Sequence, residues 1–161
     1  DLYDHKLDLV MDNAKRLHVA DKISTQKMDA TTVHEHFAPD TFDKILVDAP
    51  CSGIGLIRRK PDIKYNKENQ DFNALQEIQL QILDSVCQTL RKGGIITYST
   101  CTIFDEENFQ VINKFLETHP NFEQVKLSHT QEDIVRDGCI AITPEQYQTD
   151  GFFIGQVKRI L

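Results

Sequence analysis

The stretch FDKILVDAPCSG, residues 42–53, decides the fold together with GGIITYSTCT, residues 93–102. Each stretch contains a short apolar run bounded by turn residues, which predicts a buried parallel strand. Each run then leads into a polar loop that holds one cysteine. Ligands of open α/β sheets bind at the carboxyl ends of the strands, so the spacing predicts that Asp48, Cys51 and Cys101 meet in one crevice.

The composition is that of one globular domain. The 161 residues are 40% hydrophobic and 27% charged, and a chain of this length can bury a sizeable core. No segment approaches the ~18 apolar residues that a membrane span requires, and no signal peptide is evident. We therefore predict a cytoplasmic protein with no membrane partner.

Four cysteines are spread widely along the chain, at positions 51, 87, 101 and 139. No CxxC pair and no cysteine–histidine spacing indicates zinc, so we predict free thiols and no metal site. Cys87 and Cys139 are predicted to be small buried side chains. For Cys51 and Cys101, in polar loops at the predicted sheet rim, the spacing fits a structural thiol and a reactive thiol equally well.

The net charge of −7 argues against a protein that binds nucleic acid over its whole surface. The one dense basic stretch is Arg58-Arg59-Lys60, continued by Lys64 and Lys67, directly after the first cysteine loop. Such a run is either a solvated loop or a local contact with phosphates.

Apolar residues at helical spacing predict three helices. They cover residues 4–17, 71–90 and 105–119. Gly93-Gly94 is predicted to stop the second helix. The acidic residues Asp105–Glu107 are predicted to occupy the first turn of the third, where they favour the positive end of the helix dipole.

Short apolar runs predict the remaining strands. They lie at residues 23–28, 122–127 and 151–157, and residues 1–3 resemble the tail of a further strand. The segment 52–69 is predicted to be mostly loop, and the segment 128–149 is polar and weakly patterned. We expect an α/β sheet that is parallel where helices connect its strands, with the last two strands forming an antiparallel, hairpin-like edge.

Three acidic residues follow predicted strands. Asp1 and Asp29 are placed as ribose-hydroxyl ligands would be in a nucleotide-binding sheet, although a single Asp in such a position is more often a helix cap or turn former. Asp48 is predicted to end a buried strand, where an unpaired carboxylate would be costly.

Several segments resemble the Sun/Fmu family of S-adenosylmethionine-dependent RNA cytosine-5 methyltransferases, most specifically the bacterial type that methylates small-subunit ribosomal RNA. They are FDKILVDAPCSG, RRKPDIKY, LRKGGIITYSTCT, DEEN and DGFF. The resemblance covers nearly the whole chain. It implies a Rossmann-like class I methyltransferase sheet, with residues 1–161 as a single partial catalytic domain.

The resemblance also implies roles for individual residues. Cys101 is expected to be the nucleophile, Cys51 to assist product release, and Asp48 to touch the cytosine and the cofactor region. Asp1 and Asp29 match the positions that bind the ribose and adenine ends of S-adenosylmethionine. Carbon 5 of cytosine is a poor nucleophile, so a thiolate must first add to carbon 6, and a protonated Asp48 would stabilise that adduct.

The resemblance extends to the RNA partner and to what the chain lacks. Arg58, Arg59 and Lys60 are expected to contact RNA phosphates. The family's glycine-rich cofactor loop and N-terminal RNA-binding portion have no counterpart in the sequence. We therefore expect an N-terminally truncated sheet, inactive alone and open to self-association through exposed edges. Residues 23–28 should pair with residues 44–47 or be displaced.

Two other functions remain open. One is a Rossmann-like methyltransferase that acts on another substrate and whose cysteines are structural. The other is a noncatalytic module for RNA binding or assembly.

Overall fold

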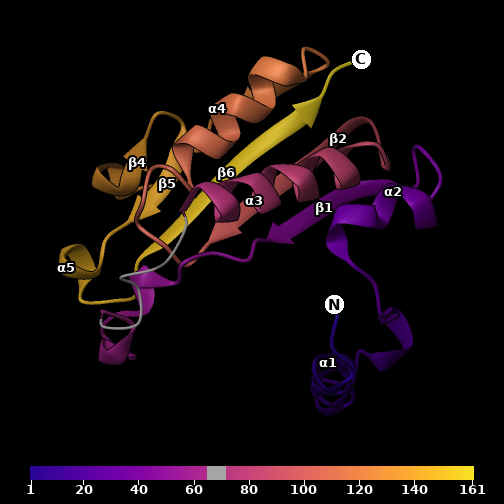
Figure 1. The fold of residues 1–161 in the computed structure, drawn as a ribbon, viewed down its shortest axis with the longest axis horizontal. Coiled ribbons are helices and arrows are strands. Elements are labelled where there is room, and N and C mark those ends of the chain that lie inside the picture. The colour runs from indigo at the N-terminus through magenta and orange to yellow at the C-terminus, as the bar shows by residue number, and fades with distance from the viewer. Residues whose placement is uncertain (65–71) are drawn as a thin grey trace.

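A computed structural model describes residues 1–64 and 72–161. Three predicted features lie partly or wholly outside the described residues: Lys67, residues 65–69 of the predicted loop, and residue 71 of the predicted helix. Within them, six strands form one sheet in the order β1-β2-β6-β5-β4, and β3 also pairs with β6 (Figure 1). The strands are β1 (Phe42–Asp48), β2 (Leu90–Thr100), β3 (Phe122–Val125), β4 (Val135–Arg136), β5 (Cys139–Ile142) and β6 (Phe152–Arg159).

The two strands that the sequence marked out, β1 and β2, are parallel neighbours. Their register aligns Lys44 with Ile95 and Asp48 with Ser99. The connection contains α3 (Phe72–Cys87), as expected for a parallel crossover. Both strands therefore deliver their following loops to the same edge of the sheet.

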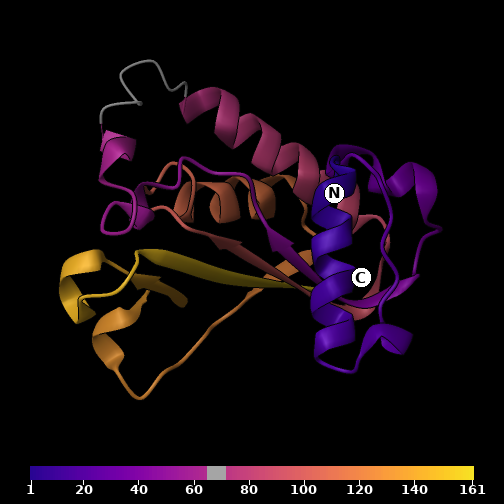
Figure 2. The same cartoon turned by 90° about the horizontal axis from the view of Figure 1, so that it is seen from below.

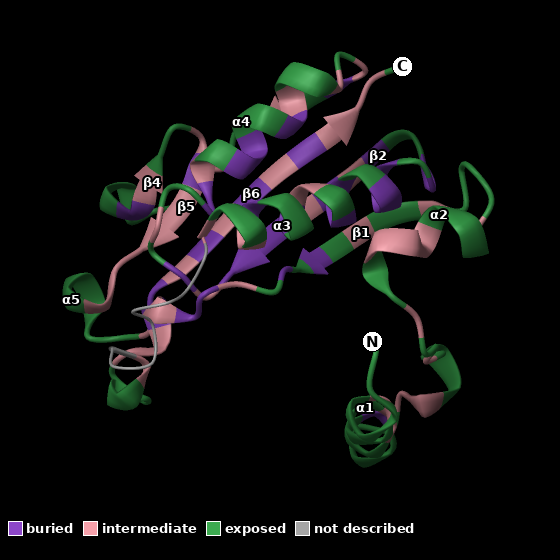
Figure 3. Cartoon of the chain, viewed as in Figure 1, coloured by how far each residue is buried: buried purple, intermediate pink, exposed green. Residues whose placement is uncertain are grey.

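The core lies between the sheet and two helices, α3 and α4 (Phe109–Thr118), which pack on one of its faces (Figure 2). Buried residues run along these helices and along β2 and β6 (Figure 3). Fully buried side chains include Leu83 from α3, Ile96 and Tyr98 from β2, and Phe115 from α4. Burial of such side chains contributes about 1.5–3 kcal/mol each, so this layer fixes the sheet that carries both cysteine loops.

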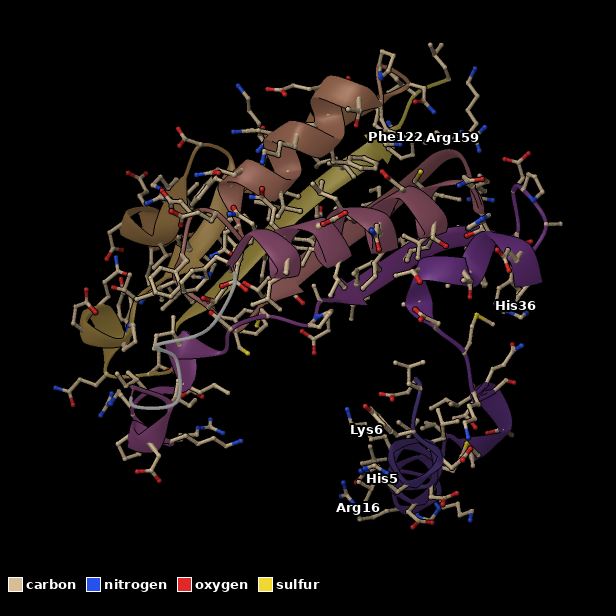
Figure 4. All side chains as sticks on the ribbon, viewed as in Figure 1. His5, Lys6, Arg16, His36, Phe122 and Arg159 are labelled. Atoms are coloured by element: carbon tan, nitrogen blue, oxygen red, sulfur yellow. The ribbon has the colours of Figure 1, made fainter. Side chains whose placement is uncertain are left out.

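The N-terminal arm, residues 1–29, lies apart from the sheet (Figure 1). Its helix α1 (Asp4–Arg16) has one buried residue, Ala14. Figure 4 shows Lys6 and Arg16 on this helix, far from Phe122 and Arg159. A 3₁₀ turn at Ala30–Thr32 and the short helix α2 (Val33–His36) connect the arm to the sheet and pack against α3.

Two expectations about strands were wrong. Residues 23–28 form no strand; the segment instead lies beside the first residue, where Met28 N donates to Asp1 O at 3.0 Å. Among the described residues β1 pairs with β2 alone, so residues 23–28 are displaced, one of the two outcomes expected. The hairpin-like edge is also absent, because the weakly patterned segment 128–149 supplies β4, β5 and the short helix α5 (Pro144–Tyr147). As a result β6 lies inside the sheet, and its antiparallel pairing with β3 is not a hairpin.

Two expectations about helix ends were also wrong. Helix α3 ends at Cys87, before Gly93 and Gly94, which lie within β2. Gly93 has φ +78°, a conformation that favours glycine, so the pair shapes the irregular start of the strand. Helix α4 begins at Phe109, after Asp105–Glu107, and those residues form a turn.

No helix among the described residues is both long enough and apolar enough to cross a lipid bilayer.

Candidate active site at the carboxyl ends of β1 and β2

The two cysteine loops meet at the carboxyl ends of the central strands, as the spacing predicted. Ala49 N donates to Ser99 O at 2.9 Å, which extends the β1–β2 pairing into the loops. Cys51 Sγ and Cys101 Sγ then lie 3.2 Å apart. Both cysteines are half-buried and free. The geometry brings two thiols into hydrogen-bond contact.

The environment of Cys51 keeps its side chain protonated. Burial, together with the hydrogen bond to Cys101, raises the pKa of the Cys51 thiol to about 12. At neutral pH Cys51 is therefore a thiol that can donate to the neighbouring sulfur. Cys87 and Cys139 are buried, which confirms the prediction for those two residues.

A close backbone crossing fixes the Cys101 loop from the other side. Gly55 N donates to Cys101 O at 3.0 Å, and Gly151 N donates to Gly55 O at 2.8 Å. A Cβ at Gly55 would lie 2.3 Å from Gly151 O, so only glycine allows this approach. The DGFF segment at the start of β6 is thereby joined to both cysteine loops.

A buried carboxylate holds the Cys51 loop. Glu107 is 0% exposed, and its Oε1 accepts from Ser52 N at 2.7 Å and from Gln79 Nε2 at 3.2 Å. Gln79 Nε2 also donates to Pro50 O at 3.0 Å. The backbone on both sides of Cys51 is therefore tied to Glu107 and Gln79.

The next residue in the chain holds the Cys101 loop. Asn108 Nδ2 donates to Thr102 O at 3.0 Å, and Asn108 Oδ1 accepts from Thr100 Oγ1 at 2.5 Å. A further contact of 2.8 Å joins the hydroxyls of Ser52 and Thr102. These buried polar residues tie the two loops to each other.

The sequence analysis missed the roles of Gln79, Glu107 and Asn108. One signal was present in the sequence: Gln79 lies three residues before the apolar Ile82, which places both side chains on the same face of the predicted helix. The segment DEEN was noted only as part of the family resemblance.

Asp48 lies at the predicted position but in a different environment. Its carboxylate accepts from Ser99 Oγ at 3.3 Å, and the residue is exposed. The expectation of a buried, costly carboxylate was therefore wrong, because β1 is an edge strand among the described residues.

Asp1, Asp29 and Asp48 line one cleft of about 850 Å³ between the N-terminal arm and the sheet. Asp1 Oδ1 accepts from Tyr3 N at 3.1 Å. Asp29 caps the turn that follows it, where hydrogen bonds from Thr31 N and Thr31 Oγ1 lower the pKa of the Asp29 carboxyl. Both residues thus act as turn formers and also face a common cleft.

The basic stretch is exposed on the loop that follows Cys51. Arg59 forms an ion pair with Asp150 at 2.8 Å, although its own side chain is 76% exposed. Arg58 and Lys60 are exposed as well. Within residues 1–64 and 72–161, no group of three or more His, Cys, Asp or Glu side chains could hold a metal ion.

Comparison with known sequences gives one consistent result. The model of the family "16S rRNA methyltransferase RsmB/F" matches residues 1–158. The chain is 44% identical to the probable ribosomal RNA small subunit methyltransferase B of Bacillus subtilis (strain 168), over 99% of the chain and 36% of that protein. It is 43% identical to the ribosomal RNA small subunit methyltransferase B of Enterobacter sp. (strain 638), over 75% of the chain and 28% of that protein. The chain thus spans about a third of the length of these relatives.

Solved structures support the fold. The crystal structure of PH0851 matches 99% of the chain and 36% of its own, with a TM-score of 0.92 and 28% identity. A methyltransferase homologue from Pyrococcus horikoshii matches 99% of the chain and 52% of its own, with a TM-score of 0.76 and 28% identity. The Rossmann-like methyltransferase fold expected from the sequence is confirmed.

Proposed function

Because the chain belongs to the 16S rRNA methyltransferase RsmB/F family, we propose that the full-length protein transfers a methyl group from S-adenosylmethionine to carbon 5 of a cytosine in ribosomal RNA. Family membership supports the cofactor and the class of RNA. The observation that supports the cytosine chemistry is the 3.2 Å contact between the sulfurs of Cys51 and Cys101. A ribosomal substrate agrees with a cytoplasmic location, which stays a prediction.

The cleft lined by Asp1, Asp29 and Asp48 fits the cofactor. Its volume of about 850 Å³ lies within the ~300–1,000 Å³ of small-molecule sites. Carboxylates at Asp1 and Asp29 can accept hydrogen bonds from ribose hydroxyls and the adenine amino group. The bound cofactor would supply an electrophilic methyl group, and Asp48 links this cleft to the cysteine loops.

The proposed chemistry begins with Cys101. Its thiolate adds to carbon 6 of the cytosine, forming the S–C6 bond while the C5=C6 electron pair becomes available at carbon 5. Carbon 5 would then form its bond to the methyl group while the bond between that methyl group and the cofactor's sulfur breaks. A solvent water would accept the carbon 5 proton, the electron pair of the C–H bond would restore the C5=C6 double bond, and the S–C6 bond would break, so the Cys101 thiolate leaves.

Cys51 is suited to the last of these steps. Its pKa of about 12 keeps the thiol protonated at neutral pH. A protonated Cys51 can donate a hydrogen bond to the Cys101 sulfur as that sulfur regains negative charge. This stabilises the departing thiolate, and we therefore assign Cys51 to resolution of the adduct.

Asp48 and the basic stretch complete the proposal. The exposed Asp48 carboxyl can reach a base that enters between the cleft and the thiols; we assign it the cytosine ring nitrogen, where protonation would stabilise the adduct. Arg58, Arg59 and Lys60 follow the Cys51 loop directly and are assigned to RNA phosphates.

The test separates the two thiols in the full-length protein. Cys101→Ser should abolish methylation and form no covalent RNA species, because an alkoxide is far harder to generate near neutral pH than a thiolate. Cys51→Ala should accumulate a protein–RNA species that survives denaturing electrophoresis. If Cys101→Ser accumulates the covalent RNA species and Cys51→Ala abolishes it, Cys51 is the nucleophile. If neither variant forms the covalent species, both cysteines are structural.

A further inference from the structure

We propose that Glu107 and Asn108 are positioning residues that hold the Cys51 loop and the Cys101 loop, respectively, at the separation their chemistry requires. This inference rests on the proposed function and extends it to residues that touch neither the base nor the cofactor. Two consecutive residues each contact the backbone of a different cysteine loop.

The Glu107 contact reaches the residue next to Cys51. Its Oε1 accepts from Ser52 N, and Gln79 Nε2 bridges the same oxygen to Pro50 O. Tyr98 OH also donates to Glu107 O at 2.7 Å, which anchors the backbone of Glu107 to β2. A rigid strand thus determines where the Cys51 loop lies.

The burial of Glu107 is not explained by stability. Its Oε2 and the neighbouring Gln79 Oε1 are buried without a hydrogen-bond partner among the described residues. Unsatisfied buried oxygens cost free energy, and an apolar side chain in this place would avoid that cost. Only an acceptor at this point can hold Ser52 N, so the arrangement serves the geometry of the loop.

Asn108 holds the other loop, which contains Cys101. Its amide donates to Thr102 O and accepts from Thr100 Oγ1, so it holds the residues on both sides of Cys101. The Ser52–Thr102 hydroxyl contact couples the two loops. Movement of either loop would change the 3.2 Å distance between the cysteine sulfurs.

Two variants of the full-length protein, one of them isosteric, test the role of Glu107. Glu107→Ala removes the acceptor of Ser52 N, whereas Glu107→Gln keeps an acceptor oxygen there. We expect Glu107→Ala to accumulate the covalent RNA species as Cys51→Ala does, and Glu107→Gln to resolve it as the wild type does. Adduct resolution that is unchanged in Glu107→Ala would overturn the role of Glu107.

For Asn108 the informative change is Asn108→Asp, which keeps the shape but replaces the amide that donates to Thr102 O with an acceptor. We expect the rate of adduct formation to fall at least tenfold. A misplaced Cys101 raises the activation free energy, and an increase of about 1.4 kcal/mol is enough for a tenfold slower rate. Val111 is fully buried on α4, and its side chain cannot form hydrogen bonds with the loops, so Val111→Ala is the control for general destabilisation. Equal losses of adduct formation in Asn108→Asp and Val111→Ala would overturn the role of Asn108.

A second readout does not depend on methyl transfer. Alkylation of Cys51, followed by peptide mass spectrometry, should be roughly tenfold faster or more in Glu107→Ala, because a released loop exposes the thiol and increases its thiolate fraction. Glu107→Gln and Val111→Ala should react as the wild type does. If the wild type fails to methylate cytosine, the proposed function fails; if alkylation is equally slow in Glu107→Ala, the positioning inference fails.

Discussion

The cysteine loops and the N-terminal arm are held in opposite ways. The loops are tied through buried side chains from α3 and from the turn before α4. The two ties to the Cys51 loop, from Glu107 and Gln79, cross between segments distant in sequence. The described hydrogen bonds of the arm stay within residues 1–32, as in the ion pair of 2.6 Å between Lys27 and Asp4. The rim proposed as catalytic is thus built into the core, while the proposed cofactor side depends on contacts within the arm.

The solvent exposure of apolar side chains also differs between the arm and the core. The arm leaves apolar side chains in solvent, including Leu9 at 59% and Leu17 at 58%, whereas Leu83 behind the cysteine loops is 0% exposed. Partly exposed apolar side chains contribute little to stability. We therefore expect the two regions to respond differently to the same substitution.

The largest expected effect comes from Leu83→Ala. Truncation of this buried side chain should lower the free energy of unfolding by about 2–5 kcal/mol. The matched change Leu9→Ala in α1 should alter it by less than about 0.5 kcal/mol. Denaturant titration of both variants measures the difference, and equal losses would mean that the arm is as firmly packed as the core.

The next effect is a loss of stability at high pH. Burial raises the pKa of Cys87 to about 12, from 9.0. Because the folded pKa is the higher one, its contribution to stability is fully present below pH 9 and is lost as pH rises toward 12. The free energy of unfolding should fall by up to about 1.4 kcal/mol per pH unit from this group. Cys87→Ala should flatten the decline between pH 9 and 11, and an unchanged slope would contradict the assignment.

A smaller effect is expected on RNA binding by the full-length protein. Replacing Arg58, Arg59 and Lys60 with Ala should weaken binding and reduce its dependence on salt, because each phosphate contact to a single strand contributes about 0.7 to the slope of log affinity against log salt concentration. Lys6→Ala, on the distant α1, serves as the control. An unchanged slope in the triple variant would make the stretch a solvated loop.

The smallest expected signal is cofactor binding by residues 1–161 alone. Binding must first order the loosely held arm against the sheet, which costs conformational entropy. We therefore expect calorimetry to give an affinity for S-adenosylmethionine weaker than 1 μM, about −8.2 kcal/mol. Tighter binding would show that the arm is already fixed.

The parallel central strands and the meeting of their loops could be predicted from residue pattern and connectivity. Two short apolar runs separated by a predicted helix favour parallel neighbouring strands. Because such strands bring the loops at their carboxyl ends together, the sequence predicted that Cys51 and Cys101 meet. The family, and with it the Rossmann-like fold, could be recognised from the same segments. These features are local or follow from connectivity.

The environment of the acidic residues depends on the packing of distant segments and could not be predicted from the sequence. Glu107 looks like a charge that favours a helix dipole, yet it is buried because α3 packs over the turn in which it lies and supplies Gln79. Asp48 looks buried, yet it is exposed because residues 23–28 do not pair with β1. Burial depends on which distant segments arrive beside a residue, and local pattern carries no information about that.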